Sequence, residues 1–310
     1  MLSIIIASCN EQNLANVEQS ISQTVGIPYE TVVIRNPNQK YSLAEAYNLG
    51  AEKAKFDFLL FVHEDVVFHT KDWGKNLISH FENLPDAGVL GISGTSYKTF
   101  APGGWWNPNY SYLYVNHWQS FKFTEREREL WRRQAEKAAE VICLDGVFLA
   151  IKKEVFNQIK FDKSIKGFHG YDLDLSLAVS EKYKNYFIPD ILLEHFSEGN
   201  VDDKWLETAF VLFKKWENVL PKNSAANQFA DKKTEAEVFV NYIKLVFQSD
   251  ISFNRKMRIF SYSTYAVIRK LHIPFRILFS ASKMAARSFF SEEKLQFARK
   301  ISTGKGVSNL

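Results

Sequence analysis

Two clusters of acidic and histidine side chains are the strongest candidates for chemistry in this sequence. The first, His63-Glu64-Asp65, directly follows the apolar run Phe58–Val62. If the backbone stays extended through it, His63 and Asp65 share one face and Glu64 points to the other. A carboxylate and an imidazole on one face could hold a divalent cation. The spacing therefore predicts a site for a cation or a polar ligand at the end of a strand.

The second cluster lies near the middle of the chain, in Phe168-His-Gly-Tyr-Asp-Leu-Asp-Leu175. Asp172 and Asp174 come where a helical pattern begins, so Asp172 could simply cap that helix. A positioned carboxylate could instead act as a general base. Farther along, His195 is either a further cation ligand or a neutral histidine in a loop.

Helix and strand signals indicate how the first cluster would be positioned. Ser42 and Glu45 form a capping box at the start of a predicted helix. The continuous apolar run Phe58–Val62 is typical of a central parallel strand covered on both faces. Leu2–Ala7 and Thr31–Ile34 are two further predicted strands. In open α/β sheets, ligands bind at the carboxyl ends of the strands, where the first cluster stands.

The order of these motifs resembles that of inverting nucleotide-sugar glycosyltransferases of the GT-A fold, the glycosyltransferase family 2-like proteins. Asn48-Leu-Gly50 is similar to the Asn-x-Gly of the family's helix. His63-Glu64-Asp65 occupies the place of its Asp-x-Asp motif, with His63 in place of the first Asp. Residues 171–175 resemble its Glu-Asp-x-Asp-Leu segment, with Tyr171 in place of the Glu. The resemblance implies an α/β fold: a GT-A-like, mostly parallel sheet flanked by helices, with a C-terminal helical appendage.

The resemblance also implies a role for each candidate residue. Asp172 would be the catalytic base, and Asp65, aided by His63 and His195, would bind a divalent metal, Mn²⁺ or Mg²⁺. The residues implied in binding the nucleotide-diphosphate sugar donor are Ser8, Asn10, Glu11, Arg35, Glu64 and Asp145. Arg35 stands where the family has an acidic motif that reads the base, so base recognition is not implied there. Asp145 precedes Gly146, so a turn explains it as well as sugar binding does.

The implied reaction transfers a sugar from the nucleotide-diphosphate donor to a hydroxyl acceptor with inversion. The acceptor would be a glycan or a lipid-linked molecule, in a bacterial type of cell-surface polysaccharide synthesis. The alternative is a non-catalytic carbohydrate- or nucleotide-binding module on a GT-A fold, because both acidic motifs are altered.

Length and composition fit one large domain with an appendage. The 310 residues are 46% hydrophobic and 15% aromatic, which excludes a disordered protein. We expect a GT-A-like domain at residues 1–220 and a basic helical appendage at 221–310, divided where Pro, Asn and Ser interrupt the periodicity.

Cys9 and Cys143 lack metal spacing and are predicted to be buried thiols in a reducing compartment. No apolar run near 18 residues occurs, so a cytoplasmic chain is expected.

The basic charge is concentrated at the C-terminal end. Residues 250–310 hold 12 Lys or Arg against 3 Asp or Glu, a net of +9, whereas the chain as a whole carries +4. Phenylalanines and tyrosines interleave with this charge, which is typical of helices on an anionic membrane surface. A helical appendage with a solvated basic face is the alternative. Nucleic-acid binding is not expected, because no recognised motif accompanies the charge.

Two further segments carry expectations. The aromatic-rich stretch Phe100–Asn116 either stacks on sugar rings or packs on the sheet. The charged stretch Glu125–Glu140 is predicted to be an amphipathic helix with a solvated face.

Overall fold

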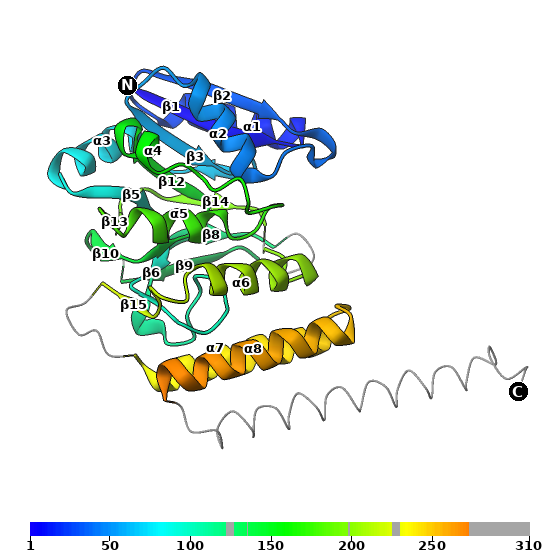
Figure 1. Ribbon diagram of the computed structural model, residues 1–310. Coiled ribbons are helices and arrows are strands. Elements are labelled where there is room, and N and C mark those ends of the chain that lie inside the picture. The colour runs from blue at the N-terminus through cyan, green and yellow to red at the C-terminus, as the bar shows by residue number, and fades with distance from the viewer. Residues whose placement is uncertain (122–126, 135, 198, 225–229, 273–310) are drawn as a thin grey trace, which may run out of the picture.

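A computed structural model describes residues 1–121, 127–134, 136–197, 199–224 and 230–272 of the chain. Within these residues, the main sheet has seven strands. In sheet order they are β10 (Ala139–Val141), β13 (Lys184–Phe187), β5 (Ala87–Gly91), β12 (Phe148–Lys152), β3 (Phe58–Val62), β1 (Leu2–Ser8) and β2 (Tyr29–Arg35). All but β10 and β12 run in one direction (Figure 1). The predicted α/β fold with a mostly parallel sheet is confirmed.

Helices cover both faces of the main sheet, because its strands are apolar on both sides. In β1, Ile4 and Ile6 pack with α1 (Glu11–Thr24) and α3 (Trp73–Asn83), whereas Ile5 packs on the opposite face. The helices of that opposite face are α2 (Leu43–Lys53), α4 (Lys153–Gln158) and α5 (Tyr171–Val179). The predicted capping box of Ser42 and Glu45 begins α2.

A second sheet begins where β3 ends. In order, it contains β11 (Cys143–Leu144), β6 (Ser93–Thr95), β8 (Leu113–Gln119), β14 (Leu193–His195) and β4 (Val66–Phe68), and β9 (Glu129–Arg133) pairs with β8. Residues 63–65 are the link between β3 and β4, so they pass from one sheet to the other. Shorter elements are η1 (Pro37–Gln39), η2 (Tyr110–Tyr112) and a ribbon of β7 (Tyr97–Lys98) with β15 (Lys222–Asn223).

The helix predicted at Glu125–Glu140 is wrong where the structure describes that segment; residues 125, 126 and 135 lie outside the described ones. The stretch forms β9 and β10 instead. Trp131, Ala135 and Ala138 have helical spacing in the sequence, but residues 129–133 pair with β8 along their whole length, so tertiary pairing overrides the local pattern. In β9 the side chain of Trp131 is half-buried and its neighbours are exposed, which is the pattern of an edge strand.

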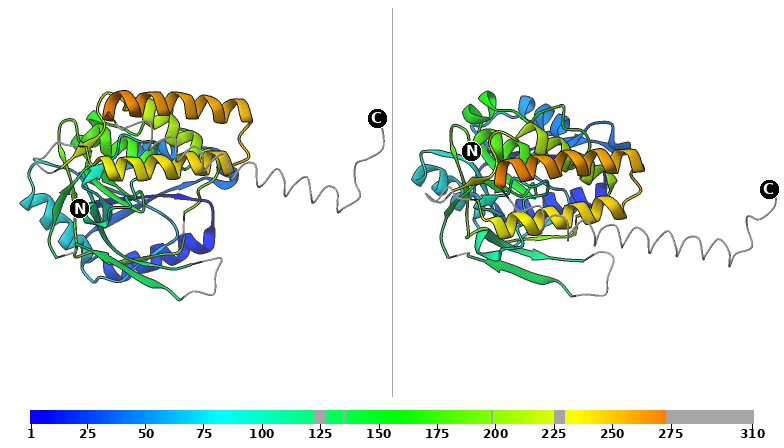
Figure 2. Two further views of the ribbon diagram at one scale, coloured as in Figure 1. Left: turned by 90° about the horizontal axis from the view of Figure 1, so that it is seen from below. Right: turned by 60° about the horizontal axis from the view of Figure 1, so that its bottom comes forward.

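Three C-terminal helices pack together at the end of the molecule opposite to β2. They are α6 (Asp203–Lys215), α7 (Lys232–Gln248) and α8 (Phe253–Leu271), and α7 and α8 lie side by side (Figures 1 and 2). Phe213 of α6, Phe239 of α7 and Val267 of α8 share one buried apolar cluster with Leu177 of α5. The helical appendage thus shares a core with the sheet-bearing part, and the boundary near residue 220 stays a prediction.

The structure bears on the predictions about membrane contact and about the two cysteines. No helix among the described residues is long and apolar enough to cross a membrane. The aromatic and basic residues of the predicted membrane-docking segment beyond His272 lie outside the described residues. Cys143 is buried as expected, but the prediction for Cys9 is wrong: its side chain is exposed, because it lies in the turn after β1 rather than within the strand.

Candidate metal and catalytic site

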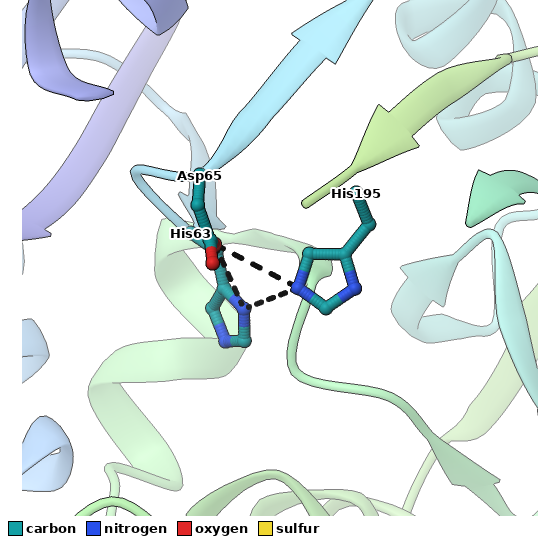
Figure 3. Close-up of side chains that lie close together, drawn as sticks. All are labelled: His63, Asp65 and His195. Carbon is teal, nitrogen blue, oxygen red and sulfur yellow. Dashed lines mark hydrogen bonds and ion pairs between the residues drawn. The ribbon is translucent and has the colours of Figure 1, made fainter. Parts of the chain in front are cut away.

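Three predicted ligands meet at the junction of the two sheets. The Nδ1 atom of His63 lies 3.9 Å from Asp65 Oδ1 and 3.5 Å from Nε2 of His195. The same His195 nitrogen lies 3.7 Å from Asp65 Oδ1. Figure 3 shows the three groups facing one another, as expected if His63 and Asp65 share a face. These side chains form a candidate metal centre.

Strand pairing explains why a residue so distant in sequence reaches this point. β14 runs antiparallel to β4, and His195 pairs with Val66, the residue after Asp65. The backbone N–H of Phe196 also donates to the carbonyl oxygen of Asp65 at 3.0 Å. The position of His195 is therefore fixed by backbone contacts that the sequence motif does not reveal.

The hydrogen bonds of His63 are compatible with metal binding through Nδ1. Its other nitrogen, Nε2, lies 2.8 Å from the hydroxyl of Tyr171, the first residue of α5. Burial raises the pKa of Tyr171 well above its usual value, so the hydroxyl keeps its proton. Metal-binding histidines commonly donate the N–H of the second nitrogen to such a partner, which orients the ring. In that tautomer, Nδ1 presents its lone pair to Asp65 and His195.

His195, the third candidate ligand, is also in a protonation state that suits metal binding. Burial lowers the pKa of His195 to about 4, with a further contribution from the neighbouring His63. The imidazole is therefore neutral at neutral pH and able to donate a lone pair. Ligand atoms that each lie about 2.1 Å from one cation are about 3–4 Å apart. The residues present thus fit a divalent cation.

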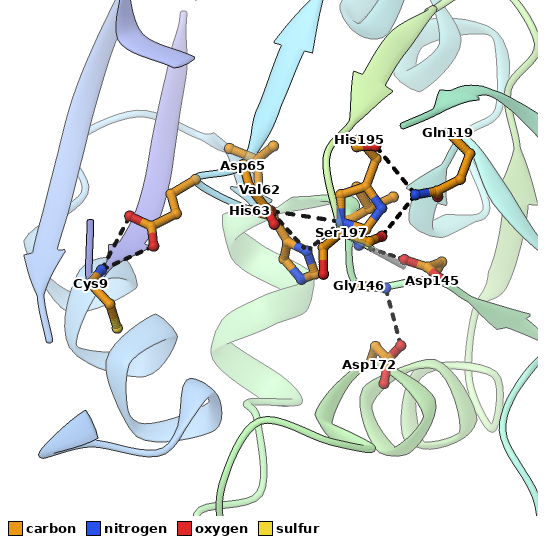
Figure 4. Close-up of polar contacts among 12 residues, drawn as sticks. Cys9, Val62, His63, Asp65, Gln119, Asp145, Gly146, Asp172, His195 and Ser197 are labelled. Atoms are coloured by element: carbon orange, nitrogen blue, oxygen red, sulfur yellow. Dashed lines mark hydrogen bonds and ion pairs between the residues drawn. The ribbon is translucent and has the colours of Figure 1, made fainter. Parts of the chain in front are cut away.

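Asp172 lies at the start of α5, next to Tyr171. Its Oδ2 accepts a hydrogen bond of 3.1 Å from the backbone N–H of Gly146, as Figure 4 shows. Burial raises the pKa of Asp172 to about 7, and the nearby carboxylate of Asp145 adds to the effect. A carboxyl with this pKa exchanges its proton near neutral pH, as a general base must. The Asp172 side chain is half-buried. Gly170, two residues earlier, has a positive φ of 75° and turns the chain into the helix.

Glu64 points away from the candidate metal centre, as the alternation of side chains along an extended backbone predicted. It is hydrogen-bonded to residues at the end of β1. Its carboxylate accepts hydrogen bonds from the Ser8 hydroxyl at 2.7 Å and from the backbone N–H groups of Cys9 and Asn10 at 3.1 and 3.0 Å. Asn10 in turn caps α1. Three of the predicted donor-binding residues therefore form one cluster, in which Glu64 links the ends of β1 and β3.

The other predicted donor residues occupy two places. Glu11, the first residue of α1, forms an exposed ion pair of 2.9 Å with Arg35, the last residue of β2. Asp145 accepts a hydrogen bond of 2.8 Å from the backbone N–H of Val147, which is the turn role considered for it. Its carboxylate also acts electrostatically on Asp172 and His195, so the turn lies beside the candidate site.

Sequence reasoning missed several residues that surround His195. Gln119 of β8 donates hydrogen bonds to the carbonyl oxygens of His195 and Ser197, at 3.3 and 2.9 Å (Figure 4). The ring of His117, two residues earlier on β8, lies 6.4 Å from the His195 ring. The strand-like alternation of Leu113-Tyr-Val-Asn-His-Trp-Gln119 is the signal that could have placed both on one face.

Comparison with solved structures gives the fold but not the activity. Part of TarS from S. aureus, residues 1–349, is similar over 99% of this chain and 93% of that chain, with a TM-score of 0.52 and 12% identity. The same portion of TarS is also known in complex with UDP-GlcNAc. GalNAc-T7 with UDP, GalNAc and Mn²⁺ is similar over 88% of this chain, with a TM-score of 0.50 and 13% identity. This chain spans 58% of that GalNAc-T7 chain.

Sequence comparison is the more specific guide here. No curated protein sequence matches the chain. A family described as "Glycosyltransferase like family" matches residues 3–218, which covers both sheets and the candidate site. With a GT-A fold and a match over more than half of its length, the chain belongs to this glycosyltransferase-like family.

Proposed function

We propose that this protein is an inverting glycosyltransferase that uses a nucleotide-diphosphate sugar and a divalent cation. One observation carries the proposal: the hydrogen bond of 2.8 Å between Tyr171 and His63. It joins the start of α5, which bears Asp172, to the candidate cation ligands. A proton acceptor and a cation site thereby come within one small region, as direct displacement of a diphosphate requires.

Asp172 is proposed as the base. It would take the proton of an acceptor hydroxyl while that oxygen forms a bond to the anomeric carbon of the sugar. The bond from that carbon to the diphosphate breaks on the opposite face, so the configuration inverts. Its pKa of about 7 leaves a substantial fraction ionised at neutral pH, while the carboxylate remains basic enough to accept a proton.

His63, Asp65 and His195 are proposed to hold the cation, Mn²⁺ or Mg²⁺. Bound there, it would stabilise the negative charge that develops on the departing diphosphate. The cluster of Ser8, Asn10 and Glu64 lies at the neighbouring strand end, where we propose that it lines the donor site with Arg35 and Glu11.

A transfer assay tests the proposal. We expect purified protein with Mn²⁺ to release UDP from one of a panel of UDP-sugars, and Asp172→Asn to lower that rate about 10²–10⁴-fold. Asp174→Asn is the matched control on the same helix: its carboxylate bonds Lys215 and Trp216, so the fold should weaken while catalysis persists. Full activity of Asp172→Asn would exclude it as the base.

The same assay separates enzyme from binding module. Donor binding in calorimetry without release of UDP under any condition would favour the non-catalytic alternative.

We further propose a glycan or lipid-linked acceptor for the synthesis of cell-surface polysaccharide, at the inner face of a membrane. TarS, which is similar in fold, is known in complex with UDP-GlcNAc, which supports a nucleotide-sugar as the donor.

A further inference from the structure

A row of aromatic rings extends from the candidate metal centre along the outer edge of the second sheet. Its members are His117 of β8, Trp131 of β9, Trp106 and Tyr110. Neither the hydrogen bonds of the candidate site nor the proposed reaction uses them. Strand register places His117 and Trp131, and ring contacts place Trp106 and Tyr110 beside them.

Register puts His117 and Trp131 on the same face of the sheet as His195. In the parallel pair, His195 lies opposite Gln119, and in the antiparallel pair His117 lies opposite Trp131. Gln119 and His117 are two residues apart on one strand, so they share a face. Their partners in the pairing, His195 and Trp131, therefore lie on that face too. Trp118, between them, belongs to the other face, where Arg128 lies over its ring at 4.8 Å.

Ring contacts continue the row outward. The ring centroids of His117 and His195 are 6.4 Å apart, and those of His117 and Trp131 are 5.5 Å apart. Trp106 lies 5.6 Å from Trp131 and 6.3 Å from Tyr110. Arg133 completes the row, with its guanidinium 4.2 Å from the centre of the Tyr110 ring.

Exposure rises along the row. His117 is buried and donates to or accepts from Ser93 at 2.8 Å, while Trp131 is half-buried. Trp106 is 43% exposed and Tyr110 is 52% exposed. Rings that served only to pack the sheet would be buried at this size, and a set of contiguous aromatics left open is a feature of binding surfaces.

The chemistry of this surface selects a particular class of ligand. A pyranose ring has an apolar C–H face that can lie on an aromatic plane, while its hydroxyls stay in water or bond to polar groups at the rim. A simple alkyl chain gains nothing from the polar edges of Trp and Tyr, whose N–H and O–H groups suit an amphipathic ligand. Arg133 at the outer end adds a donor for such hydroxyls.

We propose that this row binds the sugar rings of a saccharide acceptor and leads its terminal hydroxyl toward the metal centre. The inference rests on the proposed glycosyltransferase function and names the acceptor as a glycan of several residues. Ring contacts continue without a break from Tyr110 to His195, and this continuity connects the surface with the candidate site.

Saturation-transfer NMR on the full-length protein, without nucleotide, tests the proposal. The probes are cellopentaose, maltopentaose and chitopentaose. We expect at least one to receive saturation at its ring C–H protons. Trp131→Ala and Trp106→Ala should each weaken its binding about 2–10-fold, the value of one aromatic contact. Trp118→Ala is the matched control, because it removes the same side chain from the opposite face of the same strand pair.

Several outcomes would overturn the proposal: no saturation of any pentasaccharide by the unaltered protein, equal weakening by Trp118→Ala, or normal saccharide binding by the double variant Trp106→Ala/Trp131→Ala. Calorimetry with UDP and Mn²⁺ on the same samples reports on the donor site separately. Loss of UDP binding in Trp131→Ala would assign the ring to the nucleotide and contradict a saccharide platform. Saccharide binding by a protein that never binds UDP would leave the row intact and defeat the proposed function instead.

Discussion

At the scale of single residues, the site depends on two groups whose pKa values move in opposite senses from the same cause. Burial raises the pKa of Asp172 to about 7 and lowers the pKa of His195 to about 4. In both cases burial favours the neutral form. The carboxyl thereby gains basicity, and the imidazole stays free of the proton that would block a metal.

The first prediction concerns the pH dependence of transfer and of stability. Transfer should rise with pH through about 7 as Asp172 ionises. A carboxyl whose pKa is higher in the folded than in the unfolded chain binds its proton more tightly when folded. Its stabilising contribution is therefore full below the unfolded value near 4 and is lost as pH rises to about 7.

Asp172→Asn should remove that ionisation. Its melting temperature should exceed that of the unaltered protein at pH 8 and approach it at pH 4, as scanning calorimetry can measure. A variant that is less stable at pH 8 would show that the carboxylate is stabilised by contacts other than those described.

The second prediction concerns the choice of metal. Two imidazoles with one carboxylate form a softer ligand set than oxygen atoms alone, so the site should bind Mn²⁺ more tightly than Mg²⁺. Titration calorimetry should find this order, and Asp65→Ala should abolish metal-dependent binding of UDP with little change in melting temperature. His80→Ala is the control, because this half-buried imidazole lies on α3 and contacts Asp190 at 2.7 Å. Equal affinity for both metals would argue against coordination by the histidines.

The grouping of His63 with Asp65 could be predicted from the sequence better than the surroundings of this candidate metal centre, for a physical reason. His63 and Asp65 follow one strand, so local alternation is enough to place them on one face. Alternation alone puts His117 and Gln119 on one face of β8, but that this face meets His195 follows only from the pairing of β8 with β14. The partnership of Tyr171 with His63 likewise depends on how α5 meets the end of β3.

At the scale of elements, prediction succeeded where apolar residues are continuous and failed at an edge. β3 and α2 were predicted because their core faces are complete. β9 was taken as a helix because an edge strand needs few buried residues, and charged side chains suit a helix surface equally well. That error concealed Trp131, whose position opposite His117 depends on pairing.

A third prediction tests how α7 is attached. The carboxylate of Glu235, fully buried, accepts hydrogen bonds from the Tyr97 hydroxyl at 2.6 Å and from the backbone N–H groups of Phe100 and Ala101 at 2.8 and 3.0 Å. Glu235→Ala leaves three buried donors without this acceptor. Each unsatisfied group costs about 1–3 kcal/mol, so the free energy of unfolding should fall by several kcal/mol.

Denaturant titration measures this loss, and Glu237→Ala, exposed on the same helix, should change the stability little. A loss below about 1 kcal/mol for Glu235→Ala would mean that water replaces the carboxylate, and that α7 is held by its apolar face alone.

At the scale of the whole molecule, the C-terminal charge divides into two parts. Within α8, Arg255 pairs with Glu207 and Arg269 pairs with Glu217, while Lys256 donates to the carbonyl oxygens of Phe247 and Ser249. These side chains attach the helix to the rest of the protein. Residues 273–310 hold seven further Lys or Arg against two Glu, a net of +5 in the sequence that follows α8.

The fourth prediction assigns that remaining charge to an anionic lipid surface. Each Lys or Arg near such a surface contributes about 1 kcal/mol, so a net of +5 is enough for reversible attachment. Full-length protein should co-sediment with vesicles containing phosphatidylserine at low salt and less so as salt screens the charge.

A full-length variant with the seven Lys and Arg of residues 273–310 changed to Gln should stay in solution. Ending the chain before α8 is a poor test, because Ile259 and Val267 belong to the core. Equal sedimentation of both proteins, or sedimentation indifferent to lipid charge, would leave the basic segment as a solvated appendage.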